Sequence, residues 1–340
     1  MRILIIRSWG RTAFELGEYC KNAFEEIGHA ASLFDYNDER ISSRFSFLGN
    51  IEKTFAQRNL LRKISNFKPN LILVIKGDRV PLAIIHKIKD EFKIPVANYW
   101  IDDPYYIDIS QKISSFYDYF FTNDPECVQI HKKSGCRHAK FLSFGCLPEL
   151  HKKINLSEGD YKQYASDICF AGTVSEGRMK ILEALGDFNL KIWSPPIVSL
   201  LGKEYKIEKK EIARTLPIYK KFKGHAVWAR NLIKAYNASK IVLNIHSPQP
   251  VPIMRDFEVT GCGAFLLTDH ARELKSVFKL GKEIVCYRNI DELKNKIEFY
   301  LSHPQKREEI ARQGQKRSYK CHTYAIRMQE LISFIEKMES

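Results

Sequence analysis

The sequence predicts an α/β protein built from two Rossmann-like domains, each with a doubly wound parallel sheet. The chain has 340 residues, which is more than one hydrophobic core usually supports. Short runs rich in Ile, Val, Leu and Phe alternate with longer segments of helical periodicity, as in buried parallel strands joined by helices. This alternation occurs in two series separated by a polar stretch. We therefore expect two successive sheets that face a central cleft, where a ligand binds.

The first series contains five apolar runs that end in turn residues such as Gly77-Asp78. These runs predict strands at residues 2–6, 70–76, 96–101, 119–123 and 140–144. The segments between them predict helices at residues 13–27, 51–67, 82–91 and 125–134. We expect residues 1–150 to form the first domain.

The polar stretch at residues 147–164 predicts the linker, because its pattern loosens into Pro, Lys, Ser, Glu and Gly. The second series then predicts strands at residues 167–171, 190–193, 241–245, 264–268 and 284–287. Its helices are expected at residues 178–185, 228–236, 291–301 and 304–318. Residues 195–224 are basic and irregular, which indicates an irregular loop or a separate excursion of the chain. We assign residues 151–320 to the second domain.

The net charge of +14 predicts a surface that attracts anions, whether nucleic acid, an anionic membrane face or phosphorylated small molecules. Basic residues occur in scattered pairs, which is typical of a solvated surface; peripheral membrane association is the alternative. No apolar stretch approaches the ~20 residues of a membrane span, so we expect a soluble, cytoplasmic protein. The eight cysteines include no C-x-x-C pair and are interpreted as thiols.

The segment from Asn244 to Asp269 is the most informative part of the sequence. A strand ends at Asn244-Ile-His246, prolines hold an extended loop, and a short helix begins near Met254. Gly261 and Gly263 are then expected to end the helix ahead of the next strand. Because unpaired N–H groups at a helix N-terminus attract anions, this segment suits a diphosphate.

Arginine and acidic side chains give this segment its chemistry. Arg255 offers a forked donor to phosphate, and Glu258 is an acceptor that suits two ribose hydroxyls. Gly172 and Thr173 follow the first strand of the second series, where small residues allow the backbone to approach phosphate, and Arg178 follows in the next helix. An ordinary turn between a strand and a helix is the alternative for Gly172-Thr173.

The same segment resembles the donor site of a known family. Its pattern is Arg-x-Phe-Glu, a small residue with Cys-Gly, and an apolar strand that ends in Thr-Asp: Arg255, Phe257, Glu258, Cys262, Gly263, Thr268 and Asp269. This pattern resembles the CgeB-like (spore maturation protein) glycosyltransferases, and the likeness extends to residues 99–104, 121–124, 167–173 and 314–327. These enzymes belong to the GT-B superfamily.

The resemblance implies sugar transfer from a nucleoside diphosphate sugar in the cleft, without a metal or other cofactor. It also implies a role in bacterial glycan biosynthesis and a last helix, within residues 321–340, that crosses back to the first domain. In retaining GT-B enzymes a second acid lies eight positions ahead of Glu258, and here that position is Pro250. The stereochemical outcome therefore stays open. His246 is a candidate to face the sugar, the alternative being a local hydrogen-bond partner.

The loops after the first three strands of the first domain should open at one edge of its sheet. They carry the candidate acceptor or cleft residues Gly10, Arg11, Lys76 and Asp102. Asp78 and Asp103 are candidate catalytic carboxylates, because such a group accepts a proton or stabilises a cationic centre. The alternative is that Asp102 or Asp103 caps the turn before Pro104. A metal-binding pair is disfavoured, since adjacent residues of an extended segment point to opposite sides.

Two other functions stay open. One is a non-catalytic module that binds anions or nucleic acid through the basic surface, and the other is a GT-B-type epimerase that acts on a nucleotide sugar without an acceptor. For the transferase, the expected partners are a nucleotide sugar and an acceptor that is a glycan, a protein or a lipid-linked molecule. No nucleic acid is expected.

Overall fold

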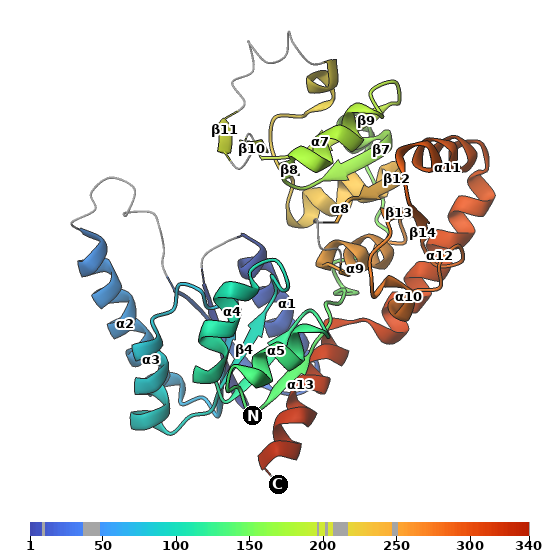
Figure 1. The fold of residues 1–340 in the computed structure, drawn as a ribbon. Helices are drawn as coiled ribbons and strands as arrows, with labels where there is room; N and C mark the ends of the chain where they lie inside the picture. The colour runs from blue at the N-terminus through green and yellow to red at the C-terminus, as the bar shows by residue number, and fades with distance from the viewer. Residues whose placement is uncertain are drawn as a thin grey trace. The chain divides into compact units, whose positions relative to one another are not determined.

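The computed structural model describes residues 1–8, 11–36, 48–195, 197–200, 203–206, 217–246 and 251–339 (Figure 1). Contacts divide the chain into two compact units. Unit 1 comprises Met1–Phe144 and Tyr324–Ser340, and unit 2 comprises Gly145–Thr323. Each unit contains a parallel sheet with helices, so the predicted fold class of two Rossmann-like parallel sheets is confirmed.

Unit 1 has six parallel strands in the order β2-β1-β3-β4-β5-β6. They are β1 (Arg2–Arg7), β2 (Ala30–Asp35), β3 (Leu71–Ile75), β4 (Val96–Trp100), β5 (Tyr119–Thr122) and β6 (Ala139–Phe141). Strands β3, β4 and β5 are buried along their whole length, which explains their continuous apolar sequences. The strand order reverses between β1 and β3, so the ligand crevice of this sheet is expected at their carboxyl ends.

The sequence did not predict β2. Its residues Ala-Ala-Ser-Leu-Phe-Asp are only partly buried, because β2 is the edge strand of the sheet. An edge strand lacks the continuous apolar run by which the central strands are recognised.

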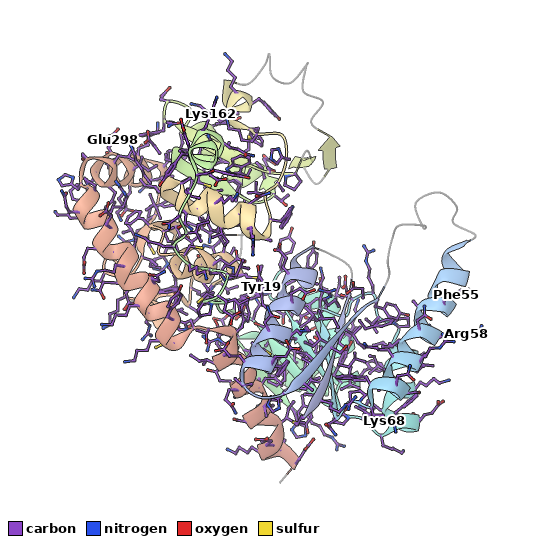
Figure 2. The ribbon with its side chains drawn as sticks, turned by 180° about the vertical axis from the view of Figure 1, so that it is seen from behind. Tyr19, Phe55, Arg58, Lys68, Lys162 and Glu298 are labelled. Carbon is purple, nitrogen blue, oxygen red and sulfur yellow. The ribbon has the colours of Figure 1, made fainter. Side chains whose placement is uncertain are left out.

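The helices of unit 1 include the last helix of the chain. They are α1 (Arg11–Glu26), α2 (Leu48–Phe67), α3 (Leu82–Lys87), α4 (Ile107–Ile113), α5 (Cys127–Lys133) and α13 (Tyr324–Glu339). The ring of Tyr324 packs 5.4 Å from the ring of Tyr19 on α1, which is labelled in Figure 2. Arg327 donates a hydrogen bond of 3.0 Å to the carbonyl of Phe144.

Unit 2 has five parallel strands in the order β14-β13-β12-β7-β9. They are β7 (Ser166–Ala171), β9 (Leu190–Trp193), β12 (Ser239–Asn244), β13 (Leu266–Asp269) and β14 (Val285–Tyr287). Here the order reverses between β7 and β12. The crevice at the carboxyl ends of these two strands therefore lies between the loop at Gly172 and the end of β12 at Asn244.

A small second sheet in unit 2 was not predicted. Strand β10 (Ile197–Leu200) pairs parallel with β8 (Val174–Ser175) and antiparallel with β11 (Lys203–Lys206). The expectation of an irregular loop at residues 195–224 is therefore wrong for the described strands of that segment.

The helices of unit 2 cover its parallel sheet. They are α6 (Glu158–Tyr164), α7 (Glu176–Glu183), α8 (Ala229–Asn237), α9 (Met254–Gly261), α10 (Leu274–Val277), α11 (Ile290–Ser302) and α12 (Pro304–Cys321). Thr260 on α9 and Ser318 on α12 join these two helices by a hydrogen bond of 2.6 Å between their hydroxyls. Among the described residues, no helix has the length and apolar character needed to cross a membrane. All eight cysteines lie in the described part of the chain and are thiols rather than disulfides.

Candidate functional site

The guanidinium of Arg255 connects the two loops at the strand-order reversal of unit 2. Its Nη1 donates a hydrogen bond of 2.8 Å to Oδ1 of Asn244, the last residue of β12. Its Cζ lies 5.9 Å from the ring centroid of Phe170 in β7. Gly172 has a φ of +152°, and a Cβ at that position would lie 2.6 Å from Nη2 of Arg255. Glycine is therefore required here by the backbone conformation and by the close approach of Arg255.

A second arginine lies at the same loop. Arg178, on the first turns of α7, donates a hydrogen bond of 2.8 Å from Nη1 to the carbonyl of Thr173, whose side chain is exposed. Its Nε is buried and has no hydrogen-bond partner within the described part of the chain. Burial and the positive charge of Arg255 lower the pKa of Arg178 to about 10. Two cations so close together, one with an unused donor, form a site that favours an anion.

Buried side chains behind Arg255 form a continuous network. Asn244 donates a hydrogen bond of 2.7 Å to Oδ1 of Asp256, whose Oδ2 lies 2.9 Å from Nε2 of His246. Nδ1 of His246 lies 2.6 Å from Oδ1 of Asp269, and its backbone N–H donates to the same carboxylate. The network joins the ends of β12 and β13 to the first turn of α9. It therefore fixes the backbone position from which the Arg255 side chain extends.

His246 is a charged structural residue. Burial alone would lower the pKa of His246, but Asp256 and Asp269 outweigh that effect and raise it to about 9. The hydrogen bonds and charge of His246 in turn hold the pKa of Asp269 below its usual value, against the effect of burial. Both ring nitrogens are engaged by carboxylates and the side chain has no exposed surface. The expectation that His246 faces the sugar is therefore wrong, and the alternative of a local hydrogen-bond partner holds.

The N-terminus of α9 is also occupied from within the protein. Asp256 accepts a hydrogen bond of 2.9 Å from the backbone N–H of Ile253, just ahead of the helix. Its negative charge lies where the helix dipole favours an anion. The positive charge that contacts Gly172 is that of Arg255, whose Nη2 would lie 2.6 Å from a Cβ at that position.

Three further residues predicted to bind the donor have packing roles. Phe257 is fully buried, with its ring 5.7 Å from Phe278. A Cβ on Gly261 would lie 2.8 Å from Cβ of Cys146, so glycine permits α9 to approach that segment. Gly263 has a φ of +62°, the left-handed conformation that commonly ends a helix.

Glu258 lies on α9 in a buried position, 3% exposed. Its Oε1 is 3.8 Å from Nε2 of His151. Burial lowers the pKa of His151 to about 3, so this imidazole is neutral at pH 7. Nδ1 of His151 accepts a hydrogen bond of 2.8 Å from the N–H of Leu147, which places the ring proton on Nε2, toward Glu258.

In unit 1, the structure brings Lys76, Asp78 and Asp102 together at the carboxyl ends of β3 and β4. Nζ of Lys76 lies 2.8 Å from Asp102 and 4.0 Å from Asp78, and all three side chains are partly exposed. Burial would lower the pKa of Lys76, but the two carboxylates outweigh it and raise that pKa. Gly10 lies outside the described residues; Arg11 begins α1 and its side chain is outside the description.

Asp103 is not part of the cluster formed by Lys76, Asp78 and Asp102. Its carboxylate is buried and accepts hydrogen bonds from Ser110 at 2.7 Å and Thr122 at 2.6 Å. Nε2 of His131 lies 2.8 Å from the same group. A carboxylate enclosed by three partners is out of reach of a substrate, so the predicted catalytic role of Asp103 is not supported. It instead holds the ends of β4 and β5 to α4 and α5.

The carboxylates of Asp102 and Asp103 have different partners, since one pairs with Lys76 and the other is enclosed. Across the described ranges, no group of three or more His, Cys, Asp or Glu side chains is placed to hold a metal ion.

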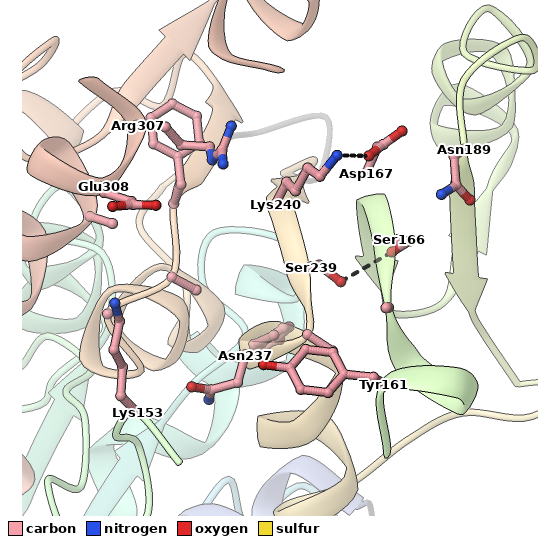
Figure 3. Close-up of a pocket in the computed structure, with 17 residues that line it drawn as sticks. Lys153, Tyr161, Ser166, Asp167, Asn189, Asn237, Ser239, Lys240, Arg307 and Glu308 are labelled. Carbon is pink, nitrogen blue, oxygen red and sulfur yellow. Dashed lines mark hydrogen bonds and ion pairs between the residues drawn. The ribbon is translucent and has the colours of Figure 1, made fainter. Parts of the chain in front are cut away.

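A pocket of about 500 Å³ lies at the opposite edge of the unit 2 sheet, where β7 and β12 begin (Figure 3). Four of its polar side chains form two pairs: Ser166 with Ser239 at 3.1 Å, and Asp167 with Lys240 at 2.8 Å. Of the residues predicted to bind the donor, Gly263 alone lines it. The two arginines instead mark the edge at the carboxyl ends.

Part of the chain matches a known family of proteins. Residues 178–333, which include both arginines and Glu258, match the family model described as glycosyl transferase-like. The chain is 25% identical over 283 residues to the spore protein CgeB of Bacillus subtilis (strain 168), covering 78% of this chain and 82% of that protein.

Solved structures share the fold. Anabaena HepE in complex with UDP-glucose superposes with a TM-score of 0.68 at 14% identity, covering 99% of this chain and all of that one. Sucrose-phosphate synthase from Thermosynechococcus elongatus gives a TM-score of 0.68 at 10% identity, covering 99% of each chain. The chain therefore resembles the spore protein CgeB and the glycosyl transferase-like family, and it has the GT-B fold.

Proposed function

We propose that this glycosyltransferase takes its sugar from a nucleoside diphosphate sugar whose diphosphate binds to Arg178 and Arg255 beside Gly172-Thr173. The observation that carries the proposal is the convergence of two guanidinium groups on one glycine-containing loop at the strand-order reversal of unit 2. Ligands of doubly wound sheets bind at such reversals. The crystal structure of HepE in complex with UDP-glucose supports the choice of ligand class.

The two arginines have complementary tasks. Asn244 engages Nη1 of Arg255, which leaves its Nη2 directed at Gly172. Arg178 has a buried Nε without a partner in the described ranges, and its pKa is lowered by the neighbouring charge. A diphosphate accepts hydrogen bonds from both groups and removes the repulsion between them. These two cations also supply the positive charge that a divalent ion supplies in metal-dependent transfer, so the proposed reaction requires no metal.

Glu258 is the proposed ribose ligand. The resemblance to CgeB-like enzymes gives it this role, and an ionised carboxylate accepts two hydroxyl hydrogen bonds. Of the two candidate catalytic carboxylates, we retain Asp78, because its side chain is 21% exposed whereas that of Asp103 is enclosed.

Isothermal titration of the full chain with UDP, GDP, ADP, CDP and TDP in the presence of EDTA tests this proposal. One nucleoside diphosphate should bind despite the chelator, and Arg255→Ala should weaken that binding while Arg312→Ala does not. Arg312 is a matched control because it lies on the exposed face of α12, paired with Glu309. Binding of no diphosphate, or binding only after a divalent ion is added, would reject the proposal.

A further inference from the structure

The carboxyl-end loops of unit 1 carry a second cluster, which includes two tyrosines that the sequence did not single out. The cluster begins with a fixed loop after β3. The hydroxyl of Ser8 donates to the carbonyl of Ile75 at 3.1 Å and accepts from the N–H of Gly77 at 3.1 Å. Lys76 has a left-handed φ of +66°. This loop lies at the strand-order reversal between β1 and β3, where a doubly wound sheet binds its ligand.

The charged part of the cluster accepts more hydrogen bonds than it donates. Lys76 contributes one positive charge and Asp78 and Asp102 contribute two negative charges, with side chains 21% to 30% exposed. These three side chains together therefore carry a net negative charge. A phosphorylated ligand would be repelled here, whereas a neutral ligand with hydroxyl donors would be favoured.

The aromatic part lies directly beside these charges. Tyr105 is 57% exposed and Tyr106 is 43% exposed, and their rings meet edge to face with centroids 4.7 Å apart. Nζ of Lys76 lies 5.7 Å from the ring centroid of Tyr106. Partial burial, followed by the influence of Tyr105 and Asp102, raises the pKa of Tyr106. The two tyrosines and the three charged residues thus form one continuous site.

A neutral carbohydrate matches both parts. A pyranose ring has an apolar C–H face that packs on an aromatic ring, and a rim of hydroxyls that donate to carboxylates. A lipid chain would desolvate the three charged groups and would offer no partner to their remaining hydrogen-bonding positions. An anionic headgroup or a nucleic acid would meet the two carboxylates.

We propose that Tyr105, Tyr106, Lys76, Asp78 and Asp102 form the acceptor site, and that the acceptor is a neutral carbohydrate whose ring stacks on the exposed tyrosines. This inference rests on the proposed function, since it names the acceptor class of the same transfer reaction. It makes the enzyme one that extends a glycan rather than one that modifies a protein or a lipid.

The test is saturation-transfer-difference NMR of the full chain with methyl glycosides of glucose, galactose, mannose, N-acetylglucosamine, rhamnose and fucose. At least one glycoside should bind, with saturation strongest at ring protons. Tyr105→Ala and Tyr106→Ala should each weaken that affinity by about three- to tenfold, and Tyr105→Phe should restore it. Tyr161→Ala is the matched control, because Tyr161 is 52% exposed on α6 of unit 2.

Titration of the same samples with the nucleoside diphosphate separates the two proposals. Diphosphate binding should be unchanged in the tyrosine variants. If the diphosphate binds but no glycoside does, or glycoside affinity is unchanged by both tyrosine variants, the carbohydrate site is rejected and the donor site stands. Binding of phosphatidylglycerol vesicles or an unglycosylated peptide in place of glycosides, lost in the same variants, would also reject it. If glycosides bind and no diphosphate does, the donor proposal fails.

Discussion

The side-chain oxygen of Asn244 accepts a hydrogen bond of 2.8 Å from Nη1 of Arg255. Asn244 ends β12 and Arg255 lies on the first turn of α9, so this bond joins the central strand of unit 2 to the helix that follows it. Asp256 orients the Asn244 amide from the other side, at 2.7 Å. The direction of the Arg255 guanidinium is therefore set by two fully buried side chains.

Replacing Asn244 with leucine should weaken diphosphate binding without a comparable effect on nucleoside binding. The change removes a hydrogen bond to a charged group, an interaction of about 1.5–3 kcal/mol, so we expect roughly a tenfold or larger loss of UDP affinity if UDP is the bound nucleotide. Isothermal titration with UDP and uridine measures the difference, and Asn189→Ala, an exposed change in the same unit, is the control. Equal losses for UDP and uridine would show that Asn244 does not act through Arg255.

Two glycines near α7 should respond in opposite ways to alanine. Gly172→Ala places a methyl group 2.6 Å from Nη2 of Arg255 at a φ of +152°, so it should displace the arginine and destabilise unit 2 by about 1–3 kcal/mol. Gly177 lies in α7, and a Cβ there would meet no residue from the rest of the protein within 4 Å, so Gly177→Ala should stabilise the helix by about 0.5–1 kcal/mol. Thermal unfolding and UDP titration of both variants check this pair. Retained UDP affinity in Gly172→Ala would contradict the position assigned to Arg255.

The buried imidazolium of His246 should make stability depend on alkaline pH. Its pKa rises from 6.5 to about 9 on folding, so its contribution is complete below pH 6.5 and is lost as pH rises through about 9. The full shift corresponds to roughly 3 kcal/mol. The melting temperature of the wild type should fall more steeply between pH 7 and 10 than that of His246→Gln. Parallel pH profiles would show that His246 is not charged in the folded protein.

Substitution of Asp78 should lower enzyme activity, whereas substitution of Asp103 should lower the stability of the fold. Asp103→Ala leaves the buried hydroxyls of Ser110 and Thr122 and the ring of His131 without their acceptor, so it should cost about 3–5 kcal/mol of folding free energy. Asp78→Asn, at a partly exposed site, should preserve the melting temperature and lower sugar transfer. Urea denaturation and a transfer assay with the bound glycoside compare them. A stable Asp103→Ala protein without activity would return Asp103 to the catalytic candidates.

The central strands of both sheets were predictable because their burial on both faces requires continuous apolar sequence, as in Leu71–Ile75. The edge strand β2 and the hairpin of β10 and β11 lack that signal. Arg255 and Arg178 could be proposed as anion ligands from their residue type and position. Asp103 and His246 were assigned to chemistry because titratable residues at strand ends resemble a site in sequence, whereas their burial and partners depend on residues 7 to 28 positions away. Asp256, inside the Arg-Asp-Phe-Glu sequence, was missed because its partners are set by the fold.

The most direct test of the account is a double-mutant cycle of Arg178→Ala and Arg255→Ala, with UDP or whichever nucleoside diphosphate binds, and the matching nucleoside as reference. Each single variant should lose about ten- to a hundredfold of diphosphate affinity, the double variant should lose less than the product of the two, and nucleoside affinity should be unchanged. Diphosphate affinity that survives both changes would contradict the claim that these two arginines form the donor site.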